Sequence, residues 1–375
     1  MTKDKPKIRV LHLIGSMGLG GAGKLVKYDV ENADPEIFEV GVACLESLGE
    51  YGHELLTKGY LVKRFDFSRS WKMTCKNLKA LLNLFKFLKY HKVDIVSSHL
   101  FIPGILARIY GKILNIHGIL HTTHNIMYPR IEPFVDNFLQ RFTNKVIVDS
   151  NAVKSKLIES GIHSENIEVI YNGIDDREFS QTLQMETEKE ALNISSDNFI
   201  LGNISGLQYY KGHDFLLDIF AQVEAKHKNV HLVLVGDGEL KDQLIEQVTD
   251  LKLSDKVHFL GKRSDIQSLI AAMDIMVHPA RWEGFGIILA EAMYCGVPVV
   301  CSDRGGIPEV VQDQVSGFVH PFGDKDAFVG SISALINDNK LRQKMANAGT
   351  LRARELFSMK QMMANYSRVY KALVE

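Results

Sequence analysis

Two carboxylates eight residues apart, Glu283 and Glu291, lie in a glycine-rich stretch that could bind a phosphorylated ligand. Glycine turns at 284–286 and 305–306 each precede a predicted helix, and the apolar run 297–301 has the pattern of a buried strand. A helix start offers unpaired backbone N–H groups and a positive dipole end, and glycine lets that backbone approach an anion. Anion donors beside carboxylate acceptors indicate a ligand with both phosphates and sugar hydroxyls.

A second glycine-rich turn follows the first predicted strand, 8–14. A strand, a glycine turn and then a helix are typical of the start of a doubly wound sheet. Gly18, Gly20 and Gly23 also satisfy G-x-G-x-x-G, with Glu46 near the expected distance, so a nicotinamide-dependent dehydrogenase is one interpretation. The pattern is weak alone, because many α/β enzymes use such a turn to let a phosphate or an acceptor approach.

Polar side chains also follow two later strand patterns in the first half of the chain. HTTHN at 121–125 follows an apolar run, so these side chains are predicted at the carboxyl edge of the sheet, where α/β sites are built. We expect His121 to be structural and His124, with Asn125, to belong to a site. The turn Asn172-Gly173-Ile174-Asp175 follows a further predicted strand.

Strand and helix patterns alternate along the chain and predict two domains. A length of 375 residues also favours about two domains. The acidic stretch 180–197 lacks a strand pattern and separates two runs of alternation. Strands are predicted in the first run at 38–45, 93–98, 146–149 and 167–170, and in the second at 199–204, 230–235, 257–260 and 275–278. We therefore predict an α/β fold with two Rossmann-like doubly wound domains, 1–178 and 179–358, facing each other across a cleft, with helix 359–375 packing on the first.

Composition indicates an ordinary globular protein, with 46% hydrophobic and 24% charged residues. Residues 1–175 carry 23 Lys and Arg against 18 Asp and Glu, a balance of +5, whereas the remainder carries 21 against 27, a balance of −6. The two halves are expected to meet different partners, none of them a nucleic acid. The four cysteines show no metal or redox spacing, and neither a signal peptide nor a membrane span is predicted. We expect a cytoplasmic protein that would act at a membrane only from its inner face.

The stretch 71–92 has helical periodicity and two distinct faces. Its apolar residues are predicted to form one buried stripe, composed of Leu78, Leu81, Leu82, Phe85 and Leu88. The opposite side carries Lys72, Lys76, Lys79 and Lys86. One interpretation is a helix that covers a sheet and exposes its lysines to water. The other is a surface that rests on anionic lipid headgroups.

Together these motifs resemble retaining glycosyltransferases of the GT-B fold, in family four, which contains bacterial polysaccharide and phosphatidylinositol mannosyltransferases. The resemblance extends over nearly the whole chain and is strongest in 199–312. It rests on the order and spacing of EGFGIILAE, CGVPVVCSDRGGIPE, YYKGHD, VGDGE, GKRSDI, NGID, HTTHN and GGAG.

The resemblance implies a nucleotide-diphosphate sugar, expected to be a UDP-sugar, in the second domain and a saccharide or lipid-linked acceptor in the first. The implied catalytic residues are Glu283 at the donor sugar, His124 beside the sugar ring and Lys211 at the leaving diphosphate. Glu291 would accept hydrogen bonds from the ribose. The other implied donor-binding positions are Gly20, Gly21, Gly206, Arg263, Gly284, Phe285, Gly286 and Ile287. Asn125, Asn172 and Asp175 are implied acceptor or cleft residues.

One position departs from the family's pattern. Members usually carry an arginine five residues before this lysine, where the present chain has Gly206. Arg304 or Arg263 could compensate for the missing cation, or the enzyme could be slower, or the acceptor could contribute. The alternative for Lys211 itself is that it only caps or solvates a helix start.

The implied chemistry is transfer with retention and without a metal or other cofactor. Retaining glycosidases commonly use two carboxylates at the bond. Because Glu291 is assigned to the ribose, front-face displacement, with the diphosphate taking the acceptor proton, is the favoured mechanism. No D-x-D pair appears where a divalent ion would hold the diphosphate. The alternatives are a nucleotide-sugar epimerase or phosphorylase of the same fold, and a non-catalytic nucleotide- or glycan-binding module.

Overall fold

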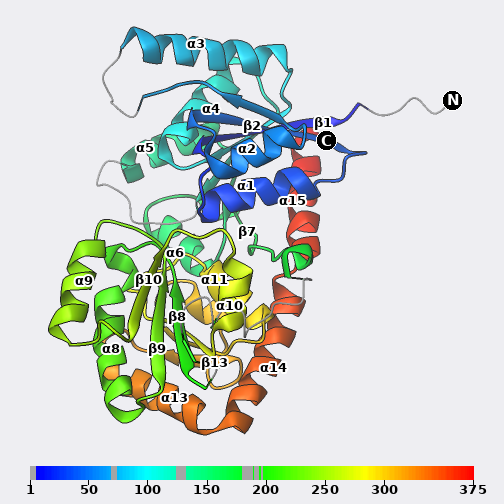
Figure 1. Cartoon of the computed structure of the whole chain (residues 1–375). Coiled ribbons are helices and arrows are strands. Elements are labelled where there is room, and N and C mark those ends of the chain that lie inside the picture. Colours follow the sequence, from blue (N-terminus) through cyan, green and yellow to red (C-terminus); the bar gives the residue numbers. More distant parts are fainter. Residues whose placement is uncertain (1–5, 69–73, 124–131, 180–188, 190–193, 196) are drawn as a thin grey trace. The chain divides into compact units, whose positions relative to one another are not determined.

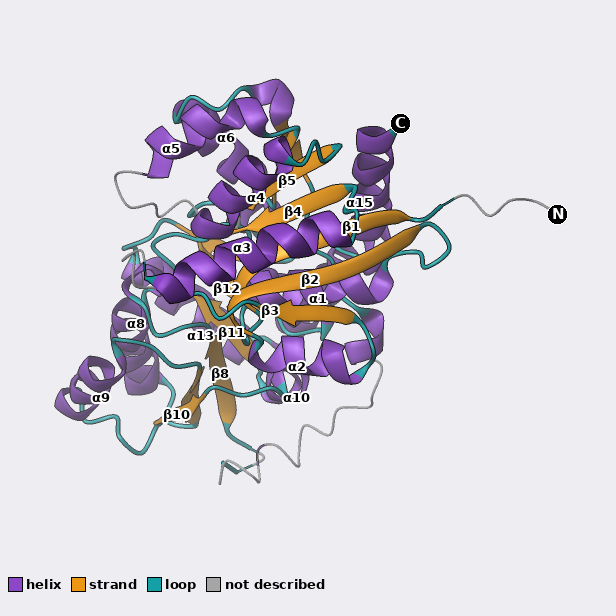
Figure 2. Ribbon diagram, turned by 90° about the horizontal axis from the view of Figure 1, so that it is seen from above, coloured by secondary structure: helices purple, strands orange, loops and turns teal. Residues whose placement is uncertain are grey.

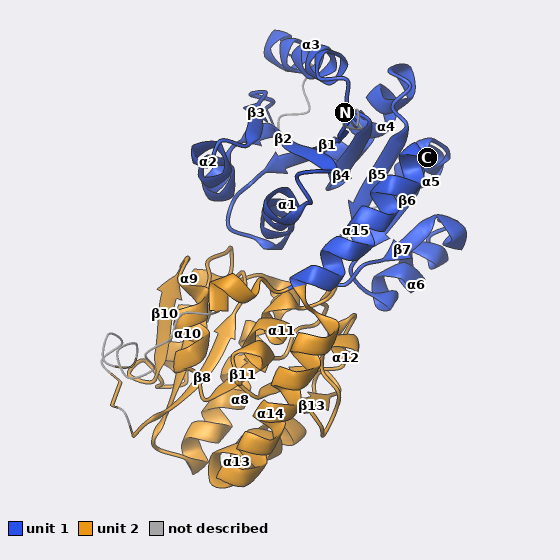
Figure 3. Ribbon diagram, turned by 90° about the vertical axis from the view of Figure 1, so that its right-hand side faces the viewer, with its two compact units in different colours: residues 1–173, 359–375 blue, residues 174–358 orange. Residues whose placement is uncertain are grey.

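The computed structural model describes residues 6–375 apart from 69–73, 124–131, 180–188, 190–193 and 196. The chain forms two compact units (Figure 3). Unit 1 comprises residues 1–173 and 359–375, and unit 2 comprises residues 174–358. The sequence-based division after residue 178 lies slightly further along the chain.

Unit 1 is built on a seven-stranded parallel sheet with the order β3-β2-β1-β4-β5-β6-β7. Its strands are β1 (Ile8–Ser16), β2 (Phe38–Ser47), β3 (Leu61–Arg64), β4 (Ile95–His99), β5 (Gly118–Thr123), β6 (Lys145–Val148) and β7 (Ile167–Val169). Its α-helices are α1 (Gly21–Asn32), α2 (Gly49–Thr57), α3 (Cys75–Tyr90), α4 (Phe101–Ile113), α5 (Glu132–Leu139), α6 (Asn151–Glu159) and α15 (Met359–Val374). Figure 1 shows the elements of both units coloured along the chain, and Figure 2 shows β2 and β4 on either side of β1, where the direction of winding reverses.

Helices cover both faces of this sheet (Figure 2). On one face Leu84 of α3 and Ala107 of α4 share a buried cluster with Leu11. On the other face Tyr370 of α15 shares a cluster with Val10. Because successive side chains of a strand point to opposite faces, the neighbours Val10 and Leu11 belong to different cores.

Helix α3 does not bury the stripe that its periodicity predicts. Leu88 is buried, but Leu78 and Leu82 are 49% and 53% exposed. Asn77 and Ala80 face inward instead. The prediction was wrong for these leucines because the apolar residues of this helix span a wide arc, so their spacing alone does not determine which side faces the sheet.

Helix α15 is tied to buried polar groups of unit 1. The Tyr370 hydroxyl donates a hydrogen bond to the Asp29 carboxylate in α1. The same carboxylate lies 2.9 Å from Nε2 of His12 in β1. All three side chains are buried, so α15 is an integral layer of unit 1.

Unit 2 repeats the plan with a six-stranded parallel sheet of order β10-β9-β8-β11-β12-β13. Its strands are β8 (Phe199–Ile204), β9 (Val230–Val235), β10 (Val257–Gly261), β11 (Ile275–His278), β12 (Val299–Ser302) and β13 (Gly317–His320). Its α-helices are α8 (His213–Lys226), α9 (Lys241–Asp250), α10 (Ile266–Ala272), α11 (Ile287–Tyr294), α12 (Ile307–Val310), α13 (Lys325–Asn337) and α14 (Asn339–Leu356). The winding reverses between β8 and β11, which creates the topological switch point of this sheet.

Two layers of helices also enclose the sheet of unit 2. Phe220 of α8 and Phe328 of α13 belong to one buried cluster with Leu232 of β9. Helices α11 and α14 pack against each other, where the Thr350 hydroxyl donates to the carbonyl of Met293 at 2.9 Å. Both units are therefore Rossmann-like, and the predicted fold class is confirmed.

Candidate functional site

The two loops that follow β8 and β11 lie at the switch point of unit 2. Lys211 ends a short 3-10 turn, Tyr209–Lys211, after β8, and Glu283 lies in the loop between β11 and α11. Parallel α/β sheets bind ligands outside the carboxyl ends of their strands at such a point. The fold therefore places both predicted catalytic residues of unit 2 where a ligand is expected.

Backbone contacts hold these two loops together. The carbonyl of Tyr210 accepts hydrogen bonds from the N–H groups of Arg281 and Trp282, at 2.8 and 3.2 Å. Gly212 has φ +73°, and a Cβ there would lie 2.1 Å from the carbonyl oxygen of Pro279. Only glycine tolerates both conditions without strain.

Arg281 reinforces the same junction with its side chain. Its guanidinium binds both carboxylate oxygens of Asp214, at 2.7 and 2.6 Å, and donates to the carbonyl of Tyr209 at 2.9 Å. A bidentate arginine–carboxylate pair fixes orientation as well as distance. The loop that carries Glu283 is thus anchored to the start of α8.

Glu283 lies between two basic side chains. Its Oε2 atom is 2.5 Å from Nζ of Lys211 and 3.0 Å from Nε2 of His278, the last residue of β11. The Glu283 side chain is only 15% exposed. Burial raises its pKa, but the charge of Lys211 and the contacts with His278 outweigh burial and lower the pKa to about 2. Glu283 is therefore an ionised carboxylate at neutral pH.

A third loop, after β12, supports the backbone of Glu283. The N–H of Gly306 donates to the carbonyl of Glu283 at 3.0 Å. Gly305 has φ +62°, and a Cβ on it would lie 1.9 Å from that carbonyl oxygen. The helix predicted beyond this turn is present as the four-residue α12. The turn supports the Glu283 loop directly.

Glycine also shapes the start of α11. Gly286 adopts φ +84° immediately before the helix, and residues 284–286 are buried. The Phe285 ring packs edge-on against Phe357, with centroids 5.3 Å apart. Glu291 is the fifth residue of α11, about one turn inside the helix, and it is 3% exposed. The turn 284–286 leads directly into α11, whose first residue is Ile287 and which carries Glu291. The backbone N–H groups of this turn and the Glu291 carboxylate are therefore held by the same helix.

The proposed substitutes for the missing arginine have partners of their own. Arg263 forms an ion pair with Asp265, and Arg304 with Asp303 at 3.2 Å. At Gly206 itself, a Cβ would lie 3.2 Å from Oε1 of Gln208, a movable side-chain end. Whether either arginine replaces the cation stays an open prediction.

The structure describes some of the predicted site residues of unit 1. Gly20 precedes α1 and Gly21 begins it, and a Cβ on either would meet no heavy atom within 4 Å. His121 is buried, with Nδ1 3.1 Å from the Ser98 hydroxyl, as expected of a structural histidine. His124 and Asn125, like Lys72, lie outside the described residues.

The NGID turn falls at the boundary between the units. Asn172 belongs to unit 1 and Asp175 to unit 2. Asp175 is buried and holds the guanidinium of Arg177 at 2.5 and 2.8 Å. This contact gives Asp175 a local structural role, and its predicted part in binding stays a prediction.

Sequence reasoning missed His278, which contacts Glu283, and Asn203, which contacts His278. Both are fully buried at the carboxyl ends of β11 and β8. A signal was available, because each is a polar residue within an otherwise apolar strand pattern, and buried polar groups need partners. Arg281, which holds the loop, was missed as well.

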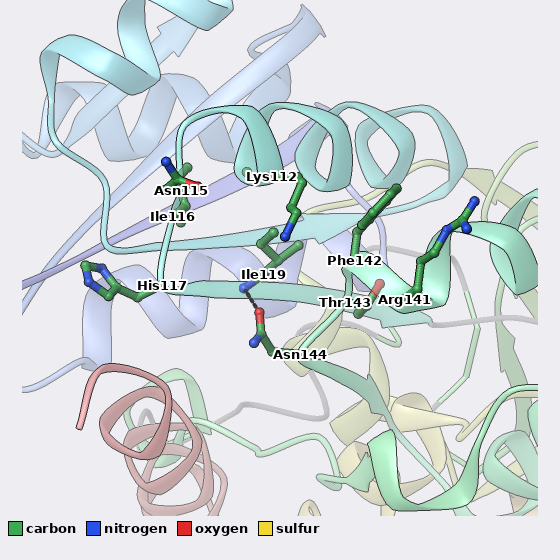
Figure 4. Close-up of a pocket in the computed structure, with 10 residues that line it drawn as sticks. Lys112, Asn115, Ile116, His117, Ile119, Arg141, Phe142, Thr143 and Asn144 are labelled. Carbon is green, nitrogen blue, oxygen red and sulfur yellow. Dashed lines mark hydrogen bonds between the residues drawn. The ribbon is translucent and has the colours of Figure 1, made fainter.

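A separate pocket of about 290 Å³ lies in unit 1 (Figure 4). Its lining includes Lys112, His117, Arg141 and Asn144, and the Asn144 carboxamide oxygen accepts a hydrogen bond from the N–H of Ile119 at 2.8 Å. The pocket lies at the amino ends of β5 and β6. Sites in parallel sheets form at the opposite edge, so it is not part of the predicted acceptor region.

Comparison with known proteins shows the family. A model described as Glycosyltransferase Family 4 matches residues 19–178, and one described as Glycosyl transferases group 1 matches residues 184–352. Together they extend over most of the chain, which therefore belongs to these glycosyltransferases and has the GT-B fold.

Individual relatives are distant but extend over most of the chain. The crystal structure of Anabaena Alr3699/HepE in complex with UDP and glucose has a TM-score of 0.87 and 25% identity, and the match covers 97% of this chain and 100% of that one. The Escherichia coli UDP-Gal:alpha-D-GlcNAc-diphosphoundecaprenol alpha-1,3-galactosyltransferase is 26% identical over 91% of each chain. The Bacillus anthracis N-acetyl-alpha-D-glucosaminyl L-malate synthase is 29% identical over 74% of each.

Proposed function

We propose that this glycosyltransferase moves a sugar from a UDP-sugar to a saccharide or lipid-linked acceptor during synthesis of a surface glycan, such as a capsule, O-antigen or exopolysaccharide. The observation that carries the proposal is the ionised Glu283, held by Lys211 and His278 at the switch point of unit 2. Supporting it, Alr3699/HepE binds UDP and UDP-glucose, and the E. coli relative is named for a diphosphoundecaprenol acceptor.

The charges in unit 2 suit such a donor. Glu283 would accept a hydrogen bond from a hydroxyl of the donor sugar, and Glu291 from the ribose. Lys211, in direct contact with Glu283, would place its ammonium group on the leaving diphosphate. A positive charge fixed where negative charge develops lowers the barrier to reaction.

We propose a front-face reaction with retention. The bond between the anomeric carbon and the diphosphate oxygen breaks, a bond forms between that carbon and the acceptor oxygen on the same face, and the acceptor proton passes to the departing diphosphate. NMR of the product distinguishes the outcomes, because retention leaves the anomeric configuration of the donor unchanged.

The test of the activity is an assay of UDP-sugars with and without saccharide and lipid-linked acceptors. Glu283→Ala is expected to lower transfer by about 100-fold or more, because it removes a charged contact to the donor. Glu246→Ala, at an exposed position in α9, serves as the control and should retain activity. Wild-type turnover by Glu283→Ala would contradict the assignment, and isomerised donor without acceptor would favour an epimerase.

Metal independence is part of the proposal. If the Lys211 ammonium supplies the positive charge at the diphosphate, wild-type transfer should be unchanged in EDTA. Lys211→Met should lose activity with or without added Mg²⁺ or Mn²⁺. Loss of wild-type activity in EDTA, restored by a divalent ion, would contradict metal independence but leave the transferase assignment standing.

We further propose that unit 1 rests on anionic membrane through α3. Leu78 and Leu82 are exposed one turn apart, and Lys76, Lys79 and Lys86 are exposed on the same helix. Exposed leucines beside lysines are the pattern of a helix that lies in a lipid interface. None of the helices in the described part of the chain combines the length and apolar character needed to cross a bilayer.

Co-sedimentation with vesicles tests this contact. Binding is expected to vesicles that contain an anionic phospholipid and to weaken when phosphatidylcholine replaces it. Leu82→Ser and Lys79→Glu should each weaken binding, whereas Lys241→Glu in unit 2 should not. Binding that is insensitive to lipid charge and to both α3 substitutions would contradict the proposal.

A further inference from the structure

A file of hydrogen-bonded polar side chains, all but one of them buried, runs through unit 2 behind Glu283. Nδ1 of His278 is 3.4 Å from Nδ2 of Asn203, and Oδ1 of Asn203 is 2.7 Å from the Ser205 hydroxyl. The same hydroxyl is 3.2 Å from Nε2 of His213. We call His213, Ser205, Asn203 and His278 the polar file. Asn203 lies in β8 and Ser205 directly follows that strand, whereas His278 ends β11 and His213 begins α8.

The contacts of Asn203 determine where hydrogens lie at the Glu283 end. The carbonyl of Val277 can only accept, and it is 2.7 Å from Nδ2 of Asn203, so that atom is the amide nitrogen. An amide N–H facing Nδ1 of His278 requires Nδ1 to accept, which places the ring hydrogen on Nε2. His278 therefore donates to the Glu283 carboxylate, which can only accept.

At the other end of the polar file, hydrogen bonds are donated in the same direction, from His213 toward Asn203. Because the Ser205 hydroxyl donates to Oδ1 of Asn203, its oxygen accepts from Nε2–H of His213. Burial, and after it the neighbouring His278 and Lys211, lower the pKa of His213 to about 3, so this ring is neutral at physiological pH. Each hydrogen bond between members of the polar file is thus donated in the direction of Glu283, and none of the members needs to carry a charge.

The two side chains that donate hydrogen bonds to Glu283, Lys211 and His278, differ in conformational freedom. Lys211 has a flexible stem with three N–H groups, and under the proposed function its ammonium also serves the diphosphate. His278 is fully buried and held on both ring nitrogens. The contact from His278 is therefore the one that stays constant when a donor binds.

We propose that His278 is a positioning residue for sugar transfer. Its Nε2–H keeps Glu283 ionised and oriented as a hydrogen-bond acceptor, so that the donor must present a sugar hydroxyl or another hydrogen-bond donor to it. This inference rests on the proposed function. His278 itself touches the carboxylate and not the sugar.

The test compares His278→Gln, which keeps an N–H donor near the position of Nε2, with His278→Met, which fills similar space without one. We expect His278→Met to lower kcat by about 10- to 100-fold, the effect of losing a hydrogen bond to a charged group. The Kd for UDP alone should not change, because UDP lacks the sugar. His278→Gln should retain kcat within about threefold of wild type. His258→Met, at the amino end of β10, is the matched control and should behave as wild type.

A second measurement needs no substrate. In a Trp71→Phe background Trp282 is the only tryptophan, and its fluorescence should report the ionisation of the adjacent Glu283. Lys211, Tyr210 and His278 are the titratable groups facing this carboxylate. His278→Met should move the acid midpoint of the fluorescence, and the acid limb of kcat, to higher pH, and His278→Gln should restore both.

Two results would overturn the inference. One is wild-type kcat in His278→Met. The other is an equal loss of kcat in both variants with an unmoved acid midpoint, which would mean that His278 only fills space. Failure of the proposed function looks different, because the wild-type protein would then bind no UDP and transfer no sugar even though the acid midpoint still shifts in His278→Met.

Discussion

At the scale of single residues, Glu283 combines burial with ionisation, and this has a consequence for stability. Its pKa is lowered to about 2, because Lys211 and His278 outweigh the opposing effect of burial. In the unfolded chain a glutamate has a pKa of about 4.3. A carboxyl whose pKa is lower in the folded state stabilises the fold above the unfolded pKa, and that contribution is lost as the pH falls through the folded pKa.

We therefore expect Glu283→Gln to reduce the pH dependence of stability. Between about pH 5 and pH 2 the free energy of unfolding of unit 2 should fall less steeply in this variant than in wild type. Urea unfolding followed through Trp282 in the Trp71→Phe background measures this. Glu246→Gln, at an exposed position, should keep the wild-type slope, and identical slopes in all three proteins would refute the role assigned to Glu283.

Gly206 is the residue at which the chain departs from its family. Gly206→Arg should lower the Kd for UDP by about tenfold, because a charged hydrogen bond to the diphosphate would be gained. The added Cβ is 3.2 Å from a movable end of Gln208, so the side chain can be accommodated. Calorimetric titration with UDP measures the change. Gly206→Ala adds the carbon without the charge and should show no gain; an unchanged Kd in the arginine variant would argue against a diphosphate near this turn.

The sequence predicted the residues of the site only where they belong to a recognisable motif. The types and spacing of Glu283 and Glu291 beside glycine turns predicted a ligand with phosphates and sugar hydroxyls, and the family resemblance added Lys211. The structure brings Lys211 and Glu283 into direct contact. His278 and Asn203 contribute through burial and pairing between strands. Those properties depend on which strands are neighbours, which local sequence does not specify.

At the scale of elements, three loops after β8, β11 and β12 act as one assembly. The Tyr210 carbonyl joins the first two, and Gly306 joins the third to Glu283. Each loop leaves the carboxyl end of a neighbouring strand, so the sheet determines their separation. A change in the backbone of any one of these loops should therefore displace Glu283.

Gly305→Ala tests this coupling. The new Cβ would clash with the Glu283 carbonyl and would also have to adopt φ +62°, which together should cost about 1–3 kcal/mol of stability. We also expect loss of transfer activity. Gly330→Ala in α13 is the matched control, since its Cβ meets nothing within 4 Å and alanine in an exposed helix should be neutral or stabilising by about 0.5–1 kcal/mol. Thermal unfolding and transfer assays compare the two, and equal behaviour would contradict the coupling.

Element prediction succeeded for the central strands and missed one edge strand of each sheet. Strands at 199–204, 230–235 and 275–278 were predicted with the bounds that the structure shows. The four-residue strands β3 and β13 were missed, and both are edge strands of their sheets. An edge strand is paired on one side only and needs no long apolar run, so its pattern is weak.

At the scale of the whole molecule, the chain enters unit 2 after Gly173 and returns to unit 1 at Met359. Unit 1 therefore depends on α15, a helix that follows unit 2 in the chain. The buried hydrogen bond from Tyr370 to Asp29 is one of the contacts that holds it. Such an arrangement allows the stabilities of the two units to be perturbed separately.

Tyr370→Phe should destabilise unit 1 selectively. Removing the hydroxyl leaves a buried carboxylate with one donor fewer, which should cost about 1–3 kcal/mol. Hydrogen exchange with peptide resolution is expected to show faster exchange in β1, α1 and α15 and unchanged exchange in β8 and β11. UDP binding should be retained. Faster exchange in unit 2 of the same size would contradict the division into independent units.

The two crossings between the units have one further consequence. Within unit 2, the N–H of Ile174 donates to the carbonyl of Phe357 at 2.7 Å, and within unit 1 a Cβ on Gly173 would lie 2.8 Å from Cα of Met359. Both ends of the 174–358 segment thus meet at one place. Unit 2 is in effect a cassette whose first and last residues are adjacent, and inserted domains with adjacent ends are the ones that tolerate exchange. Under the proposed function, replacing this cassette with the corresponding segment of a relative should change the sugar donor while keeping the acceptor.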